Sequence, residues 1–184
     1  WSGSTCTLDQ NYTLPAGDTL HIPSGITLTI NDIFNNYGTI ENNYSGTIIN
    51  YDTINNHNAA ILNTDGTINN EGAINNHNGA IIHNFNSGTI ITDGTFNNDG
   101  RTINNYSGLI RNDGTFNNDG TFNNDGTFNS DGTITGNDII NNQPYAETAS
   151  TGPFTLKQTF CNTMGGSWSG STCTLDQNYT LPAG

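Results

Sequence analysis

Basic residues are scarce in this sequence, and it has no long apolar run. Only 3 of its 184 residues are Lys or Arg, against 16 Asp or Glu, so the formal net charge is −13. So few cations cannot neutralise a row of phosphates, which disfavours binding to nucleic acid or to an anionic lipid surface. No stretch approaches the ~18 consecutive apolar residues of a membrane-spanning helix. We therefore expect neither a nucleic-acid partner nor a membrane span in this segment.

Good helix formers are also scarce, and Val is absent. Asn occurs 33 times, Thr 28 times and Gly 22 times, so three residue types fill 83 of 184 positions. These residues are poor helix formers, which disfavours a helical domain. Disorder is the alternative for so polar a chain, but Ile and Phe recur at regular positions, which argues against it.

The two ends of the chain carry the same sequence. Residues 1–17 read WSGSTCTLDQNYTLPAG, and residues 168–184 repeat them without a change. Chance identity over so long a stretch is negligible. We therefore expect the chain to be a segment of a tandem array, in which residue 168 occupies the place of residue 1 in the next unit.

A shorter period lies inside the long one and begins at each apolar residue followed by Asn-Asn. The five clear segments are 34–53, 54–73, 74–95, 96–115 and 116–133. The first, second and fourth are equally long, whereas the third is longer by two positions and the fifth is shorter by two. Two flanking stretches, 14–33 and 134–153, fit the common length with weaker motifs.

Each segment holds three apolar anchors, most of them six to eight residues apart. Three short strands joined by three corners would form one coil of a triangular solenoid, with coils stacked ~4.8 Å apart. Ile and Phe suit the buried pleated surface inside it, and we expect Gly before Thr-Ile or Thr-Phe to supply unusual φ angles at corners. The three expected columns are Phe34, Ile54, Ile74, Phe96 and Phe116; Ile40, Ile61, Ile81, Ile103 and Phe122; and Ile48, Ile68, Ile90, Ile110 and Phe128.

The predicted fold is therefore an all-β parallel β-helix (β-solenoid), with a repeat of about 20 residues forming each three-sided coil. The strict six-residue spacing from Ile110 to Ile134 resembles a left-handed hexapeptide helix, whereas the uneven sides of the other coils favour a right-handed one. We expect the right-handed form. We assign residues 1–13 to the end of a linker, 14–153 to about seven coils, 154–180 to the next linker and 181–184 to the following repeat.

The Asn pairs fall in register in the same alignment. Side-chain amides both donate and accept, so identical Asn residues can hydrogen-bond along a stack. The alternative is that these Asn residues merely tolerate left-handed corners, and we prefer the ladder for at least one column. The first column is Asn35, Asn55, Asn75, Asn97 and Asn117, and the second is Asn36, Asn56, Asn76, Asn98 and Asn118.

Three stretches resemble a known class of repeat. LPAGDTLHIPSGITLTI (14–30) and DGTINNEGAINN (65–76) resemble the Asn/Gly/Thr-rich β-solenoid repeats of large archaeal and bacterial surface proteins. CNTMGGSWSGSTC (161–173) is similar to the connector between such repeats. The resemblance covers nearly the whole chain and implies an extracellular fibre, an adhesin stalk or a surface coat, and it brings no catalytic residues.

The three cysteines are Cys6, Cys161 and Cys173, and Cys6 and Cys173 occupy the same position in successive repeats. Cys161 and Cys173 are close in sequence, on either side of two adjacent glycines. We predict a disulfide between them, worth ~3 kcal/mol by loop entropy, with the partner of Cys6 in the preceding unit. This would indicate an oxidising, extracellular setting. Free thiols and a metal site are the alternatives, and a metal site would need more ligands.

Acidic residues also align, and they leave an ion site open. Glu71, Asp93, Asp113 and Asp131 share one corner position, and Asp99 and Asp119 share another. Like charges repel at one-coil spacing, so we expect solvated corners, with a Ca²⁺-bridged column as the less favoured alternative. We expect no other cofactor.

Two histidines and several sequons complete the set of candidate sites. His57 and His77 are in register, and we expect exposed corner residues in preference to a metal pair. The sequons at Asn11, Asn43 and Asn105 permit N-glycosylation in a secreted chain.

No constellation for catalysis is visible. Right-handed β-helices include polysaccharide lyases and hydrolases, which need a charged cluster on one face, but the only cations are Arg101, Arg111 and Lys157. We expect no enzyme activity and no catalytic residues. The preferred function is a structural repeat of an extracellular filament or stalk that stacks end to end in a continuous solenoid, with identical repeats head to tail and lateral contacts between fibres. The alternative is an adhesin that binds glycans, or another regular target, through flat Thr/Asn/Tyr faces.

Overall fold

The computed structural model describes residues 2–105, 107–138, 140–142, 147–150, 166–169 and 172–175. Regular structure in these residues is entirely β-strand. Within the same residues, no helix long and apolar enough to cross a membrane is present.

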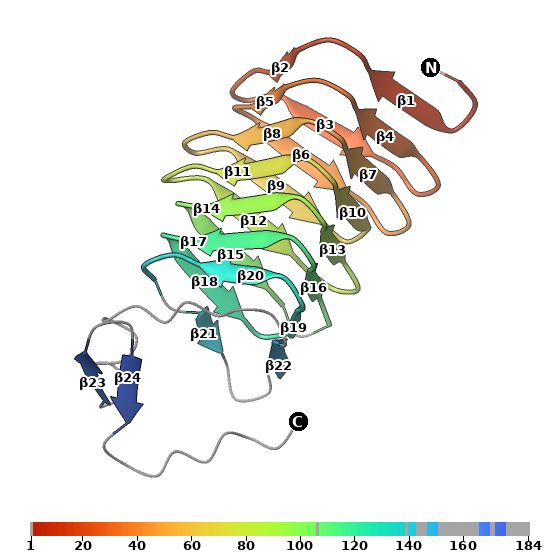
Figure 1. Cartoon of the computed structure of the whole chain (residues 1–184). Coiled ribbons are helices and arrows are strands. Elements are labelled where there is room, and N and C mark those ends of the chain that lie inside the picture. The colour runs from red at the N-terminus through yellow and green to blue at the C-terminus, as the bar shows by residue number, and fades with distance from the viewer. Residues whose placement is uncertain are drawn as a thin grey trace.

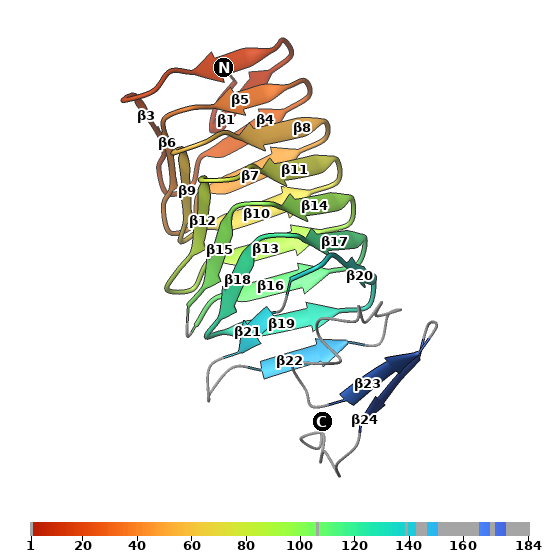
Figure 2. The same ribbon diagram turned by 90° about the vertical axis from the view of Figure 1, so that its left-hand side faces the viewer.

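The strands form three parallel sheets, which we call walls A, B and C. Wall A holds eight strands, and walls B and C hold seven each. Successive strands along the chain belong to walls B, C and A in turn, so each strand pairs with the strand one coil earlier and one coil later. This is the predicted three-sided β-solenoid (Figures 1 and 2). Its coil length is the predicted one, as the stacked pair Asn36 and Asn56 shows.

The strand bounds are as follows. Wall A contains β1 (Thr5–Leu8), β4 (Thr27–Ile30), β7 (Thr47–Asn50), β10 (Thr67–Asn70), β13 (Thr89–Thr92), β16 (Leu109–Asn112), β19 (Thr127–Ser130) and β22 (Glu147–Ser150). Wall B contains β2 (Tyr12–Leu14), β5 (Phe34–Asn36), β8 (Thr53–Asn56), β11 (Ala73–Asn76), β14 (Thr95–Asn98), β17 (Thr115–Asn118) and β20 (Thr133–Thr135). Wall C contains β3 (Thr19–Ile22), β6 (Thr39–Asn42), β9 (Ile61–Thr64), β12 (Ile81–Asn84), β15 (Arg101–Asn104), β18 (Thr121–Asn124) and β21 (Ile140–Asn142).

The coil is right-handed. Seen from the N-terminal end, the chain passes clockwise from wall B to wall C to wall A while it recedes along the axis, as the two perpendicular views show together (Figures 1 and 2). The right-handed coil expected from the uneven coil lengths is therefore present. The stretch with strict six-residue spacing, Ile110 to Ile134, is part of the same right-handed solenoid.

Most strands are four residues long and alternate between solvent and core. In β8, Thr53 and Asn55 lie on the outside, whereas Ile54 and Asn56 are fully buried. Successive side chains of a strand point to opposite faces, so a four-residue strand contributes two residues to the interior. The second residue is usually apolar and the fourth is usually Asn, and the interior therefore contains amide columns beside its Ile and Phe columns.

Two of the three predicted apolar columns are confirmed, and the one in wall C needs a correction. Ile61, Ile81 and Ile103 lie on the outer face of wall C, and the core positions belong to their neighbours Leu62, Ile82 and Thr102. A shift of one residue moves a strand residue to the other face. Two apolar residues stand side by side at 61–62 and 81–82, so the apolar pattern does not fix the phase of the strand.

Corner length explains the uneven coil lengths. The shortest segment, 116–133, has only two-residue corners, at 119–120, 125–126 and 131–132. The longest segment, 74–95, has four-residue corners at 77–80 and 85–88. Each long corner therefore adds two residues to a coil, and the strands keep their length and register.

The expected role of the glycines before Thr is wrong. Gly94 and Gly114 in the short corners do not adopt positive φ; that conformation falls on residues such as Ser45, Ala59 and Gly79 in long corners. A Cβ on Gly114 would lie 2.0 Å from the carbonyl oxygen of Gly94, one coil earlier. Glycine is required there because the backbones of stacked corners approach so closely.

The solenoid begins earlier than the sequence suggested. Residues 5–13, assigned to the linker, contribute β1 and most of β2 to walls A and B. The second copy of this sequence contributes β24 (Thr172–Leu175), which pairs antiparallel with β23 (Gly166–Ser169). The same four residues, TCTL, thus occur in a parallel wall and in an antiparallel hairpin.

Candidate functional site: amide ladders and surface columns

The inner Asn column of wall B is a continuous hydrogen-bonded ladder. Asn36, Asn56, Asn76, Asn98 and Asn118 are all buried. Each Nδ2 donates to the Oδ1 of the next Asn towards the C-terminus, over donor–acceptor distances of 2.8, 2.9, 2.8 and 2.7 Å. The predicted ladder is therefore present along this column.

The backbone satisfies the second amide hydrogen. Asn56 Nδ2 also donates to the carbonyl of Ile81 (3.0 Å), and Asn76 Nδ2 donates to the carbonyl of Arg101 (3.1 Å). Because a carbonyl can only accept, these contacts fix which end of each side chain is the nitrogen. Asn56 and Asn76 thereby each bond to the start of the wall-C strand that lies one coil later.

Two further buried amide columns were missed by the sequence analysis. In wall C, Asn84 donates to Asn104 (2.7 Å), which donates to Asn124 (2.8 Å). In wall A, Asn50 donates to Asn70 (2.7 Å). Asn recurs at the fourth position of these strands, and this recurrence could have predicted the columns. The sequence was aligned on the pattern apolar-Asn-Asn, which does not include strands whose third residue is not Asn.

These two columns are interrupted where Thr replaces Asn. Thr64 stands above Asn84, and Thr92 stands above Asn112, in the strand register. In both cases the following Asn has a buried Oδ1 without a hydrogen-bond partner, and Thr92 Oγ1 also lacks one. The Oδ1 atoms of Asn42 and Asn50 are also buried without a hydrogen-bond partner, because the residue in register one coil earlier is aliphatic, Ile22 or Ile30.

The outer Asn column of wall B forms a second, partly exposed ladder that runs the opposite way. Asn55 donates to Asn35 (3.0 Å), Asn75 to Asn55 (2.9 Å) and Asn97 to Asn75 (2.8 Å), so the donors point towards the N-terminus. At the end of the column, Asn117 donates instead to Asp119 (3.0 Å). The predicted outer ladder therefore extends from Asn35 to Asn97.

The acidic residues Glu71, Asp93, Asp113 and Asp131 stack at the corner between walls A and B. Arg111 enters this column and pairs with Asp113. Its hydrogen bond to Asp113 and the negative charges of Asp113, Asp93 and Asp131 raise the pKa of the guanidinium above its ordinary value. The column thus carries its own counter-ion, and a calcium site there stays a prediction.

Tyr37, His57 and His77 stack at the corner between walls B and C. The ring centroids of Tyr37 and His57 are 4.2 Å apart, and those of His57 and His77 are 5.0 Å apart with nearly parallel planes. Stacked imidazoles direct their nitrogens sideways, whereas a shared metal ion needs lone pairs that converge. Among the residues that the structure describes, no group of three or more His, Cys, Asp or Glu could hold a metal ion.

Burial and the neighbouring His77 lower the pKa of His57 below its ordinary value of 6.5. The Nε2 atom of His57 lies 3.2 Å from Asn35 Oδ1, at the start of the outer ladder.

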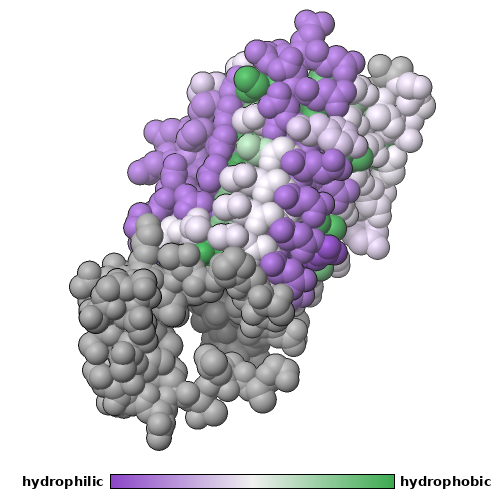
Figure 3. Space-filling model, in the orientation of Figure 1, coloured by the Kyte–Doolittle hydropathy of each residue, from purple (hydrophilic) through white to green (hydrophobic). Residues whose placement is uncertain are grey.

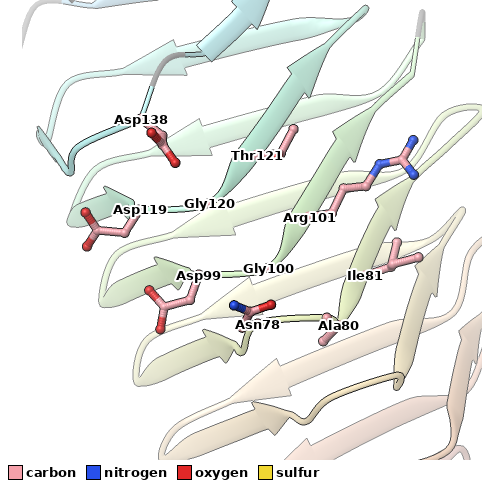
Figure 4. Close-up of a pocket in the computed structure, with 11 residues that line it drawn as sticks. Asn78, Ala80, Ile81, Asp99, Gly100, Arg101, Asp119, Gly120, Thr121 and Asp138 are labelled. Carbon is pink, nitrogen blue, oxygen red and sulfur yellow. The ribbon is translucent and has the colours of Figure 1, made fainter. Parts of the chain in front are cut away.

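A groove of about 460 Å³ follows the same corner (Figure 4). Ala80, Gly100 and Gly120 are among the residues that line it. Asp99, Asp119 and Asp138 lie along one side, and the Arg101 side chain extends away from them on the other (Figure 4). Asp119 already accepts hydrogen bonds from the backbone and side chain of Asn137. The groove therefore presents a partly satisfied carboxylate row.

The face of the solenoid seen in Figure 3 is ordered in columns. In Figure 3, hydrophilic residues run along the molecule in bands with paler bands between them, and apolar colour is confined to small spots. The outward residues of wall B from Thr53 to Thr135 are Thr, Ala and Asn, without a charge. Acidic corners border this neutral wall on both sides.

The predicted modification sites differ in accessibility. Asn11 and Asn43 are exposed, whereas Asn105 is half-buried and its Nδ2 lies 2.9 Å from His83 Nε2. Cys6 lies in β1, half-buried against the core, and is unpaired within the described chain. Cys161 and the side chain of Cys173 lie outside the described residues, so their disulfide stays a prediction.

No family model, curated protein or solved structure matches this chain.

Proposed function

We propose that the chain is a structural repeat of an extracellular filament or cell-surface stalk, in which identical units follow one another head to tail. One observation carries the proposal: residues 168–184 repeat residues 1–17, and residues 5–8 and 12–14 of the first copy are wall strands of the solenoid. The second copy therefore supplies the sequence with which another solenoid would begin. Units joined in this way form a rod.

The energetics support an array. A parallel solenoid exposes unpaired strand edges at both ends, and such edges invite pairing with another chain. Each coil buries its Ile, Phe and Asn columns only against its neighbours, so stability grows with the number of stacked coils. A tandem array supplies neighbours at both ends. The extracellular setting is proposed from the resemblance of the connector and from its cysteine spacing.

Electron microscopy of the native material tests the proposal. We expect thin rods of constant width with an axial period near 40 Å, since eight wall-A strands at ~4.8 Å span ~38 Å. Separate compact particles, or fibres without this period, would overturn it. Lateral association of the rods would appear as bundles in the same images.

A second candidate function is adhesion through wall B, which is neutral and regular. Of the tyrosines expected to stack on sugars, Tyr44 is 65% exposed but lies at the corner between walls C and A, outside wall B, and Tyr106 and Tyr145 lie outside the described residues. On a glycan array, adhesion predicts binding that Thr95→Lys and Thr115→Lys abolish and that Thr121→Lys on wall C preserves. Binding that is absent, or equally lost in all three variants, would rule out this function for wall B.

A further inference from the structure

We propose that the free edge of β1 is an interaction surface for one antiparallel strand of the preceding repeat, the strand equivalent to Gly166–Ser169. The inference rests on the tandem arrangement of the proposed function. It names the partner at the joint between two repeats and the edge on which that partner binds.

The backbone of β1 shows which edge is free. The carbonyls of Ser4 and Leu8 accept hydrogen bonds from Thr27 and Asn31, both at 2.9 Å. Even-numbered residues of β1 therefore direct their backbone groups towards β4. Backbone groups alternate sides along a strand, so Thr5 and Thr7 direct theirs to the opposite edge.

An antiparallel ladder already begins on that edge. Ser2 N donates to Thr5 O (2.9 Å), and Thr5 N donates to Ser2 O (3.0 Å). The next bonded pair of this ladder would join Thr7 to the residue two places before Ser2. That position precedes the first residue of this chain, and in a tandem array it is occupied by the copy of Ser167.

The second copy of the sequence contains this ladder in longer form. In β23–β24, Ser169 is opposite Thr172, and Ser167 is opposite Thr174. When the two copies are aligned, Ser169–Thr172 is the same pair as Ser2–Thr5, and Thr174 is the copy of Thr7. The hairpin therefore uses the edge of the TCTL strand that β4 leaves free, so both pairings can exist at once.

The parallel pairing of β1 with β4 and the antiparallel pairing of β24 with β23 together define the joint between two repeats. The TCTL strand pairs parallel with the first full coil of its own unit on one edge and antiparallel with the GSWS strand on the other. Direct parallel pairing of β22 with the next copy of β1 is excluded, because the reversed strand occupies that edge. One reversed strand added to the eight of wall A gives ~43 Å per repeat.

Amide hydrogen exchange of the full chain, followed residue by residue by NMR, tests the joint. We expect the amides of Thr172 and Thr174 to be protected and that of Cys173, on the other edge, to exchange faster. We also expect Thr7 to exchange fast in this chain. Four added residues before Trp1, Met-Gly-Gly-Ser as at 164–167, should then slow its exchange at least ~10-fold.

A Met-Pro-Pro-Pro extension of equal length is the matched control, because the proline at the position of Ser167 cannot donate to the Thr7 carbonyl and its ring takes the place of the amide hydrogen at the strand edge, which prevents pairing with β1. It should leave Thr7 unprotected. Three results would each overturn the proposal: protection of Cys173 in place of Thr172 and Thr174, an unchanged Thr7 with Met-Gly-Gly-Ser, or equal protection by both extensions. Failure to find rods by microscopy would leave these exchange results intact, so the joint and the filament are tested separately.

Discussion

Asn75 and Asn76 are adjacent in β11, yet they belong to two different ladders. Asn76 is 1% exposed and its amide makes three hydrogen bonds, two to neighbouring Asn residues and one to the carbonyl of Arg101. Asn75 lies on the outer face, half-buried, and bonds only to Asn55 and Asn97. The two columns contain the same residue at the same spacing, so burial and the backbone contact are what separate them.

The inner ladder links successive coils and two walls, whereas the outer ladder covers the outside of one wall. An inner Asn bridges two walls through its backbone acceptor, and its partners have no access to water if it is removed. An outer Asn can exchange its partners for water at little cost. The two ladders also run in opposite directions, so the aligned amide dipoles of neighbouring columns partly cancel.

The largest effect is expected when the same substitution is made in each ladder. Asn76→Ala removes three hydrogen bonds from a buried site: one amide hydrogen of Asn56 is left without an acceptor, and Asn98 Oδ1 and the Arg101 carbonyl each lose a donor. Buried unsatisfied groups cost ~1–3 kcal/mol each, so we expect the free energy of unfolding to fall by about 4 kcal/mol. Asn75→Ala should lower it by about 1 kcal/mol. Urea unfolding of both variants measures the difference, and equal losses would show that burial does not distinguish the ladders.

The next effect tests whether the corners hold the spacing that both ladders need. Gly114→Ala would place a Cβ 2.0 Å from the carbonyl oxygen of Gly94, and relief requires the coils to move apart. We expect a loss of about 3 kcal/mol in unfolding free energy, within the range of overpacked sites. Gly25→Ala is the control, because Gly25 has a φ of +75° but open space around its Cβ position. It should cost only ~1 kcal/mol for the left-handed conformation; a larger loss at Gly25 would contradict the close-approach argument.

A gain in stability is expected where the inner ladder of wall A is broken. Thr92→Asn would place an amide between Asn70 and Asn112, and its Nδ2 would give the buried Asn112 Oδ1 the partner that it lacks. Thr and Asn have similar volumes, so overpacking is small, and we expect the unfolding free energy to rise by ~1 kcal/mol. Thr89→Asn, on the outer face of the same strand, should change it by less than ~0.5 kcal/mol. Calorimetry would refute the repair if both variants behaved alike.

The wall-B ladders could be predicted because the pattern apolar-Asn-Asn recurs in nearly every coil of that wall, so successive coils can be aligned in only one register. The sequence failed on Ile81 because hydrophobicity does not choose between the two residues of the pair Ile81-Ile82, and on Ile103 because the buried residue beside it is the polar Thr102. The buried amide at the end of each strand makes that choice: Asn84 and Asn104 must face inward to continue their ladder. It also assigned Gly114 to a special φ, because close contact between backbones of successive coils leaves no mark in a single repeat. Hydrogen-bond direction within a ladder depends on carbonyls from the neighbouring wall and is invisible at the level of sequence.

The smallest effect concerns His57, which joins the outer ladder to the aromatic stack. Burial and His77 lower its pKa, so the folded state binds the proton less readily than the unfolded state does. Above pH ~6.5 both states are neutral and nothing is lost. As the pH falls through that value, the unfolded state takes up a proton first, so stability decreases until the folded-state pKa is passed.

We therefore expect the urea midpoint to fall further between pH ~7.5 and ~5.5 in the wild type than in His57→Gln. His77→Gln should remove part of the difference by removing the neighbouring charge. Identical pH profiles for wild type and His57→Gln would show that the outer stack is not coupled to folding, whereas the inner ladder, which has no titratable member, should keep its effect at every pH.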